Sequence, residues 1–176
     1  MITRMILPEA KEMLRQFRTL CITGPRQSGK TTLSKMLFRN KPYISFENPA
    51  IQNQVEQDPE TFLAQYKNGA ILDEVQRVPV IFRYLQGTLD KNTERGQFIL
   101  TGSNNFLLQE QVSQSLACRA GYLSLLPLIY AELVNAKLDK ADVHQHILMG
   151  GYLEIWAQHL IPGKWMSSYL QTYVQR

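Results

Sequence analysis

Residues 24–31 read Gly-Pro-Arg-Gln-Ser-Gly-Lys-Thr and match the pattern G-x-x-x-x-G-K-[S/T]. The apolar residues 20–23 before this stretch predict a short buried strand, and residues 32–38 after it predict a helix with one apolar face. A strand, a glycine loop and a helix N-terminus form a cradle for phosphate, because backbone N–H groups and the helix dipole both point at the anion. The stretch therefore predicts a phosphate-binding loop in an α/β fold.

The residue types inside this loop suggest separate roles. We expect Lys30 to reach the β- and γ-phosphates of a nucleotide, and Thr31 to bind Mg²⁺ through its hydroxyl. Arg26 either faces the nucleotide or pins the loop to an acid such as Glu47, and both arrangements stay open. A glycine turn without any ligand is the alternative, and the flanking strand and helix disfavour it. The expected nucleotide contacts are Gly24, Pro25, Arg26, Gln27, Ser28, Gly29, Lys30, Thr31 and Thr32.

The composition describes a folded protein of ordinary character. With 176 residues, of which 44% are hydrophobic and 19% charged, the chain is long enough for one α/β domain and a small appendage. A net charge of +4 suits nucleotide phosphates and permits a nucleic-acid partner, but no basic, aromatic-interleaved stripe supports nucleic-acid binding. Cys21 and Cys118 form no C-x-x-C pair, which favours a reducing compartment. Without an apolar run long enough for a signal peptide or membrane span, the sequence predicts a cytoplasmic protein.

Apolar runs alternate with helical patterns along the first two thirds of the chain. The expected strands are residues 20–23, 42–47, 70–74, 97–101 and 121–126. This alternation predicts a three-layer P-loop fold around a mainly parallel, five-stranded sheet. Beyond Pro127 only helical patterns remain, at 130–137, 143–149 and 165–174. We therefore expect a P-loop ATPase domain over residues 1–126 and a helical extension over residues 127–176.

Asp73 and Glu74 follow the third expected strand, about 42 residues after the phosphate loop. A P-loop ATPase needs a carboxylate at the end of a strand to hold the Mg²⁺ shell, and a base that orients the attacking water. We assign the first role to Asp73 and the second to Glu74. The alternative for Glu74 is a solvated loop acid or a helix cap.

The fourth expected strand also ends in polar residues. In ATPases with an acidic residue beside the Mg²⁺ carboxylate, a strand lies between the phosphate-loop strand and the acidic strand, and a polar residue at its end contacts the water or the γ-phosphate. Thr101, Ser103 and Asn104 are candidates for this sensor role, and Ser103 is favoured. The alternative is that Ser103 or Asn104 only caps the next helix.

Together these segments resemble an AAA-type (AAA_14-like) family of bacterial and archaeal ATPases. The resemblance is carried by residues 23–32, 72–79, 98–103, 115–119, 125–128 and 150–152. Members of this family are often followed by a nuclease-like C-terminal domain of uncharacterised function (DUF4143), so we expect this chain to be a fragment without that domain. The family usually has Gly where this chain has Cys118, which would strain the backbone if that position needs a positive φ.

The resemblance also points to an arginine. Charge on a transferring phosphoryl group is often met by an arginine from the same or a neighbouring subunit. Arg119, in a motif of the family, is the first candidate and Arg77 the second, and a surface or salt-bridging arginine is the alternative for each.

Tyr169 and Tyr173 share a helical face. This face is either packed in the core or exposed for the missing domain. Self-association through this face or through Arg119 is a further hypothesis.

The motifs favour Mg²⁺-dependent ATP binding and hydrolysis, coupled to an unknown partner or to the missing domain. A nucleotide-dependent switch or interaction module with negligible turnover is the second hypothesis. A small-molecule kinase is the third, and the adjacent Asp73 and Glu74 disfavour it because this pair suits activation of water.

Overall fold

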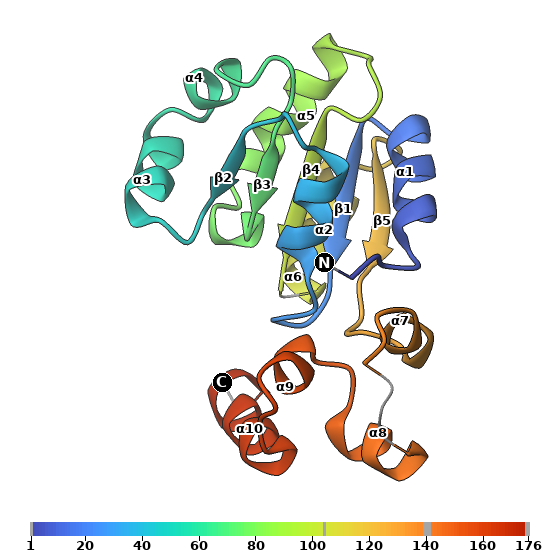
Figure 1. Ribbon diagram of the computed structural model, residues 1–176. Helices are drawn as coiled ribbons and strands as arrows, with labels where there is room; N and C mark the ends of the chain where they lie inside the picture. Colours follow the sequence, from blue (N-terminus) through green and yellow to red (C-terminus); the bar gives the residue numbers. More distant parts are fainter. Residues whose placement is uncertain (1, 104, 139–141, 175–176) are drawn as a thin grey trace. The chain divides into compact units, whose positions relative to one another are not determined.

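The computed structural model describes residues 2–103, 105–138 and 142–174 (Figure 1). Its contacts divide the chain into two compact units. The α/β unit contains Ile6–Gly24 and Lys30–Leu125, and the helical unit contains Met1–Met5, Pro25–Gly29 and Leu126–Arg176. Within the described ranges, no helix is both long and apolar enough to cross a membrane.

The α/β unit is built around one sheet of five strands in the order β2-β3-β4-β1-β5 (Figure 1). The strands are β1 (Thr19–Thr23), β2 (Tyr43–Ser45), β3 (Ile71–Asp73), β4 (Phe98–Gly102) and β5 (Ala120–Ser124). Every neighbouring pair is parallel. The predicted fold class is therefore confirmed, and β4 lies between the phosphate-loop strand and the acidic strand.

The parallel register decides where the strand ends meet. Thr23 pairs with Gly102, and Ser45 pairs with Asp73. The segments that follow β1, β3 and β4 therefore leave the sheet at the same carboxyl edge, which is where ligands bind in open parallel sheets.

Helices cover both faces of the sheet. They are α1 (Leu7–Gln16), α2 (Lys30–Leu37), α3 (Pro49–Gln57), α4 (Pro59–Ala64), α5 (Ile81–Lys91) and α6 (Asn105–Ser115), with a 3₁₀ turn at Val75–Arg77. α3 and α4 are separate because the side chain of Asp58 caps the backbone N–H of Thr61, and Pro59 begins the new helix.

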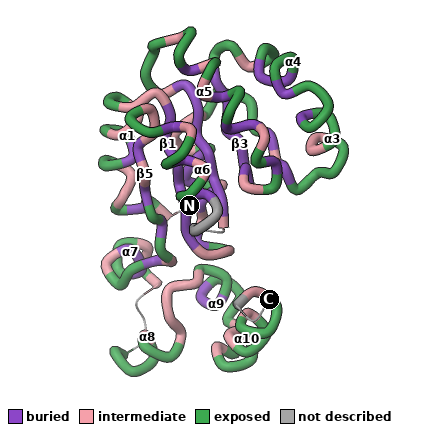
Figure 2. Tube along the Cα trace, turned by 180° about the vertical axis from the view of Figure 1, so that it is seen from behind, coloured by how far each residue is buried: buried purple, intermediate pink, exposed green. Residues whose placement is uncertain are grey.

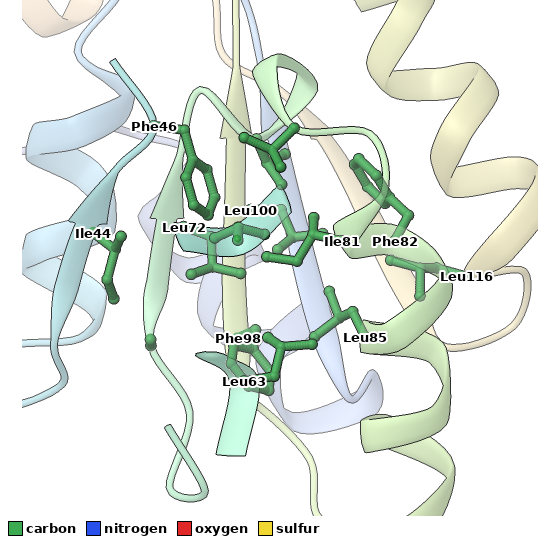
Figure 3. Close-up of a cluster of buried hydrophobic side chains, with 14 of the residues drawn as sticks. Ile44, Phe46, Leu63, Leu72, Ile81, Phe82, Leu85, Phe98, Leu100 and Leu116 are labelled. Carbon is green, nitrogen blue, oxygen red and sulfur yellow. The ribbon is translucent and has the colours of Figure 1, made fainter. Parts of the chain in front are cut away.

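Side chains alternate between the two faces of β1, as the period of a strand requires. Leu20 and Ile22 pack with Ala10 of α1 and Leu33 of α2, whereas Cys21 joins the opposite cluster with α3–α6. Figure 3 shows Leu72 and Leu100 of the sheet among residues of this second cluster. Figure 2 shows that β1 and β3 are buried along their length, as a sheet covered on both faces must be.

The helical unit contains α7 (Tyr130–Asn135), α8 (Val143–Met149), α9 (Leu153–Ala157), α10 (Pro162–Tyr169) and a π-helical turn at Leu170–Val174. The short α9 was not predicted from the sequence. A small cluster holds the unit together, with Leu128, Leu133 and Trp156 buried.

Candidate nucleotide-binding site

Lys30 and Thr31 begin α2 at the carboxyl edge of the sheet. Lys30 is only 6% exposed, and its Nζ donates a 2.9 Å hydrogen bond to the carbonyl oxygen of Gly24. Gly24 has a φ of 145°, which favours glycine. The ammonium group of Lys30 is therefore held at the start of the phosphate loop. A phosphate oxygen would replace the carbonyl oxygen of Gly24 as its hydrogen-bond partner.

Asp73, the last residue of β3, is buried and surrounded by hydroxyl groups. Its Oδ2 accepts a 2.6 Å hydrogen bond from Tyr43, and its Oδ1 accepts one from Thr101 of β4. The hydroxyl of Thr31 lies 3.5 Å from both carboxylate oxygens. A carboxylate and a hydroxyl side by side are oxygen ligands of the kind that Mg²⁺ prefers, so these residues fit the expected metal.

Glu74 adopts an unusual backbone conformation directly after Asp73. Its φ of 55° and ψ of 43° lie in the left-handed region, which costs a residue other than glycine about 1–2 kcal/mol. Its Oε2 accepts hydrogen bonds from Oγ of Ser103, at 2.8 Å, and from Nε2 of Gln76, at 2.6 Å. Strain of this kind gathers at functional sites, where the surrounding fold maintains it. Ser103 is thus brought to the acidic pair, whereas Asn104 lies outside the described residues.

The rest of the phosphate loop, Pro25–Gly29, belongs to the helical unit. Ser28 donates its backbone N–H to the carbonyl of Pro25 at 3.3 Å, and Gln27 and Gly29 have φ values of 62° and 94°. The buried hydroxyl of Ser28 has no hydrogen-bond partner within the described part of the chain. An unpaired donor inside a glycine loop fits phosphate oxygens, because buried polar groups are almost always paired.

Two elements of the helical unit hold this loop. The Nη1 of Arg4 donates a 2.6 Å hydrogen bond to the carbonyl of Ser28. The hydroxyl of Tyr169 donates to the carbonyl of Arg26 at 3.2 Å, and the guanidinium of Arg26 lies 5.8 Å from the ring centre of Tyr173. The stripe of Tyr169 and Tyr173 is therefore packed against loop residues. The remaining loop position, Thr32, is exposed on α2.

Arg119 lies at the amino ends of β1 and β5, opposite to the carboxyl edge of the sheet. Its carbonyl accepts hydrogen bonds from the backbone N–H groups of Arg18 and Thr19 at the start of β1, because β5 runs parallel to β1. Its Nε and Nη2 donate to the two oxygens of Asp90, at 2.7 and 2.9 Å. Within one chain Arg119 is therefore a salt-bridging arginine, and its role as an arginine that acts from a neighbouring subunit stays a prediction. Arg77 is exposed on the 3₁₀ turn.

Sequence reasoning gave no role to Tyr43 or Gln76. No local pattern links Tyr43 to Asp73, because only the β2–β3 register brings them together. The sequence offered one signal for Gln76, its place two residues after Glu74 in a motif of the resemblance. Cys118 does have a positive φ, 62°, as its replacement of a family glycine suggested.

The parallel sheet with β4 between β1 and β3, the glycine loop and the paired acids define a P-loop ATPase-like domain. Residues 16–134 match the AAA_14 family, described as an AAA domain, and the chain belongs to this family.

Two curated relatives are the uncharacterised proteins Rv2008c of Mycobacterium tuberculosis and Mb2031c of Mycobacterium bovis. Each is 28% identical over 170 residues, which cover 94% of this chain and 37% of the relative. The chain thus spans little more than a third of the length of these relatives.

Solved structures show the same fold. The Walker-type ATPase PABY2304 of Pyrococcus abyssi has a TM-score of 0.58 at 15% identity, covering 97% of this chain and 72% of that one. The signal transduction ATPase PH0952 of Pyrococcus horikoshii, which has a tetratricopeptide repeat sensor, has a TM-score of 0.54 at 15% identity. That match covers 88% of this chain and 29% of PH0952.

Proposed function

We propose that this chain binds Mg²⁺-ATP through residues 24–32 and hydrolyses the bond between the β- and γ-phosphates. One observation carries the proposal: Asp73 and Glu74 are adjacent, yet each carboxylate is held by its own set of donors. Asp73 is bound by Tyr43 and Thr101, and Glu74 by Ser103 and Gln76. Two neighbouring acids in different settings suit two different roles.

Thr31 and Asp73 would hold Mg²⁺, which when bound neutralises charge on the phosphate oxygens. Lys30 would contribute a second positive charge at the same phosphates. In this proposal the ammonium group leaves the carbonyl of Gly24, to which it donates at 2.9 Å, for phosphate oxygens.

Glu74 would accept a proton from the attacking water. Since Oε2 already accepts two hydrogen bonds, Oε1 is the oxygen available to that proton. Ser103 would sense the γ-phosphate from the end of β4, because the hydroxyl that contacts Glu74 follows the strand beside the phosphate-loop strand. Oxygen from water joins the γ-phosphorus as the bond to ADP breaks, and phosphate and ADP leave.

The test is Mg²⁺-dependent ATP turnover by the chain beside Glu74→Gln and Lys30→Ala. Glu56→Gln on the exposed face of α3 is a matched control. We expect Glu74→Gln to lose at least about 100-fold in turnover and still bind ATP, since general base catalysis contributes about 10²–10⁴-fold. Lys30→Ala should lose ATP affinity. Glu74→Gln hydrolysing as fast as the parent would remove the proposed role of Glu74.

A second candidate is a nucleotide-dependent switch, and the contacts of residue 26 favour it. The carbonyl of Arg26 accepts a hydrogen bond from Tyr169 at the end of α10, and its guanidinium lies over the ring of Tyr173 in the π-helical turn that follows. Tyr169 also stacks on Trp165 at 5.1 Å with an interplanar angle of 16°. A loop that rearranges around phosphate would thereby change the aromatic cluster in its own unit.

Trp165 provides the readout for this candidate. Titration with a non-hydrolysable ATP analogue should change tryptophan fluorescence in the parent, and Trp165→Phe should abolish the change. Tyr169→Phe, which removes only the hydroxyl that contacts Arg26, should reduce the change. Equal responses of the parent and Trp165→Phe would argue against a switch at this cluster.

A further inference from the structure

Gln76 shares one carboxylate oxygen of Glu74 with Ser103. Nε2 of Gln76 donates to Oε2 at 2.6 Å, and Oγ of Ser103 donates to the same oxygen at 2.8 Å. From this arrangement we infer that Gln76 is a positioning residue, which orients the carboxylate of Glu74 for proton transfer from water. The inference rests on the proposed hydrolysis and adds to it a residue that contacts the base rather than the substrate.

The backbone sets the place of Gln76. The left-handed conformation of Glu74 turns the chain into the 3₁₀ turn Val75–Arg77, so the residue two positions later returns toward the carboxylate. Val75 and Val78 are fully buried in the core, which anchors this short turn at both ends. The hydrogen bond from Gln76 is therefore made between groups that the fold already holds close together.

A glycine in β4 provides the space for the Gln76 side chain. A Cβ at Gly102 would lie 2.5 Å from Oε1 of Gln76 and 2.8 Å from Cδ2 of Leu108. Two elements distant in sequence, the turn after β3 and the end of β4, are thus shaped around this amide. A Cβ at position 102 would therefore force the side chain of Gln76 or that of Leu108 to shift.

The amide of Gln76 costs stability where it lies. Its Oε1 is buried, and none of the described residues gives it a hydrogen bond. An unpaired buried acceptor costs about 1–3 kcal/mol, so an apolar side chain would serve packing better. Rotating the amide by 180° would place its oxygen against the carboxylate of Glu74, and like partial charges would repel. The donor toward Glu74 is therefore the feature that accounts for glutamine at this position.

Two donors on Oε2 leave Oε1 of Glu74 to accept the proton. A carboxylate with both oxygens equally available can rotate between several arrangements, whereas two hydrogen bonds to Oε2 favour one rotation of the Glu74 carboxylate. Loss of alignment between a reacting pair costs about 100-fold for a displacement near 1 Å. Gln76 should accordingly affect the chemical step and not the binding of nucleotide.

The experiment compares Gln76→Met with the parent in ATP turnover, each also in a Glu74→Gln background. Gln16→Met is the matched control, because Nε2 of Gln16 also donates to a glutamate, Glu12, at 2.8 Å on an exposed face of α1. We expect Gln76→Met to lower kcat about 10- to 100-fold, with KM for ATP within about twofold of the parent. In the Glu74→Gln background the same substitution should change the residual rate by less than about twofold, because a residue acting through Glu74 has nothing left to orient.

Gln76→Asn keeps an amide but shortens the side chain, and it should lose kcat in the same way while preserving the fold. Affinity for a non-hydrolysable ATP analogue and the unfolding temperature report whether each variant is folded. A parent that hydrolyses ATP and depends on Glu74, beside Gln76 variants as fast as the parent, overturns the inference alone. So does an equal loss in both backgrounds. A parent without turnover overturns the proposed hydrolysis together with the inference.

Discussion

The hydroxyl of Tyr43 donates a 2.6 Å hydrogen bond to Oδ2 of Asp73, and this bond joins the first residue of β2 to the last residue of β3. The Nζ of Lys35 lies 4.0 Å from the centre of the Tyr43 ring. Burial, and then the hydrogen bond to Asp73, raise the pKa of Tyr43 to about 12. The edge strand thus contributes directly to the carboxylate that is proposed to hold Mg²⁺.

Tyr43→Phe should destabilise the protein by about 1 kcal/mol at neutral pH, the contribution of a typical hydrogen bond. Because the folded protein keeps the Tyr43 proton more tightly than the unfolded chain, this contribution is present below pH 10 and is lost as the pH rises toward 12. Urea unfolding of parent and variant at pH 8 and pH 11 measures the effect. The difference between them should shrink at pH 11, and a constant difference would contradict the assignment.

Arg4→Met should destabilise the helical unit strongly. Nε of Arg4 donates to Oε1 of Glu132 at 3.0 Å, and the two side chains are 10% and 3% exposed. Removing one partner of a buried pair leaves an uncompensated charge and costs about 3–5 kcal/mol. Thermal unfolding checks this, with Arg15→Met as the control, since Arg15 and Glu12 form an exposed pair. Similar unfolding temperatures for both variants would contradict the prediction.

Cys118→Gly should stabilise the protein by about 0.5 kcal/mol. The φ of 62° costs a residue with a Cβ about 1–2 kcal/mol, and glycine removes this cost. The greater freedom of glycine in the unfolded chain lowers the stability by about 0.5–1 kcal/mol, which leaves the smaller net gain. Cys118→Ala keeps the Cβ and serves as the control. If alanine stabilises as much as glycine in urea unfolding, the sulfur and not the backbone is responsible.

Arg119→Ala should leave ATP turnover within about twofold of the parent. Arg119 lies at the amino end of β1, whereas Lys30 and Thr31 lie at the carboxyl edge of the sheet. The hydrogen bonds from Arg119 lower the pKa of Asp90. A lowered pKa stabilises the fold above the ordinary range of Asp, near 3.9, and this stabilisation is lost as the pH falls through the lowered value. The parent and variant should therefore differ in unfolding midpoint at pH 7, and the difference should shrink as the pH falls through the lowered pKa of Asp90. A loss of turnover that grows with protein concentration would instead indicate that Arg119 acts across an interface between chains.

Local pattern was enough to predict much of the fold. Strands such as Ile71–Asp73 and Phe98–Gly102 appear in the sequence as short apolar runs, because a sheet buried on both faces needs them. With the π-helical turn counted as part of α10, the boundaries of the expected strands and C-terminal helices differ from the observed ones by at most three residues, and the bounds of α8 agree. The sequence did not predict the short α9. Its five residues, Leu153–Ala157, are too few for a helical period to stand out.

Contacts between distant segments could not be predicted in the same way. The role of Tyr43 depends on the pairing of β2 with β3, and the place of Arg119 depends on β5 running parallel to β1. Neither pairing leaves a trace in the residues near these positions. Arg119 was assigned from a motif, and a motif carries no information about which edge of the sheet it occupies.

The sequence by itself determined the phosphate loop, the acidic pair and the parallel α/β architecture, because each depends on residues within a few positions of one another. Only the tertiary structure decided which side chains hold those groups. Tyr43 reaches Asp73 across a strand pair, and Gln76 reaches Glu74 in the space left by Gly102. These contacts follow from strand order, register and packing, which arise when the whole sheet assembles.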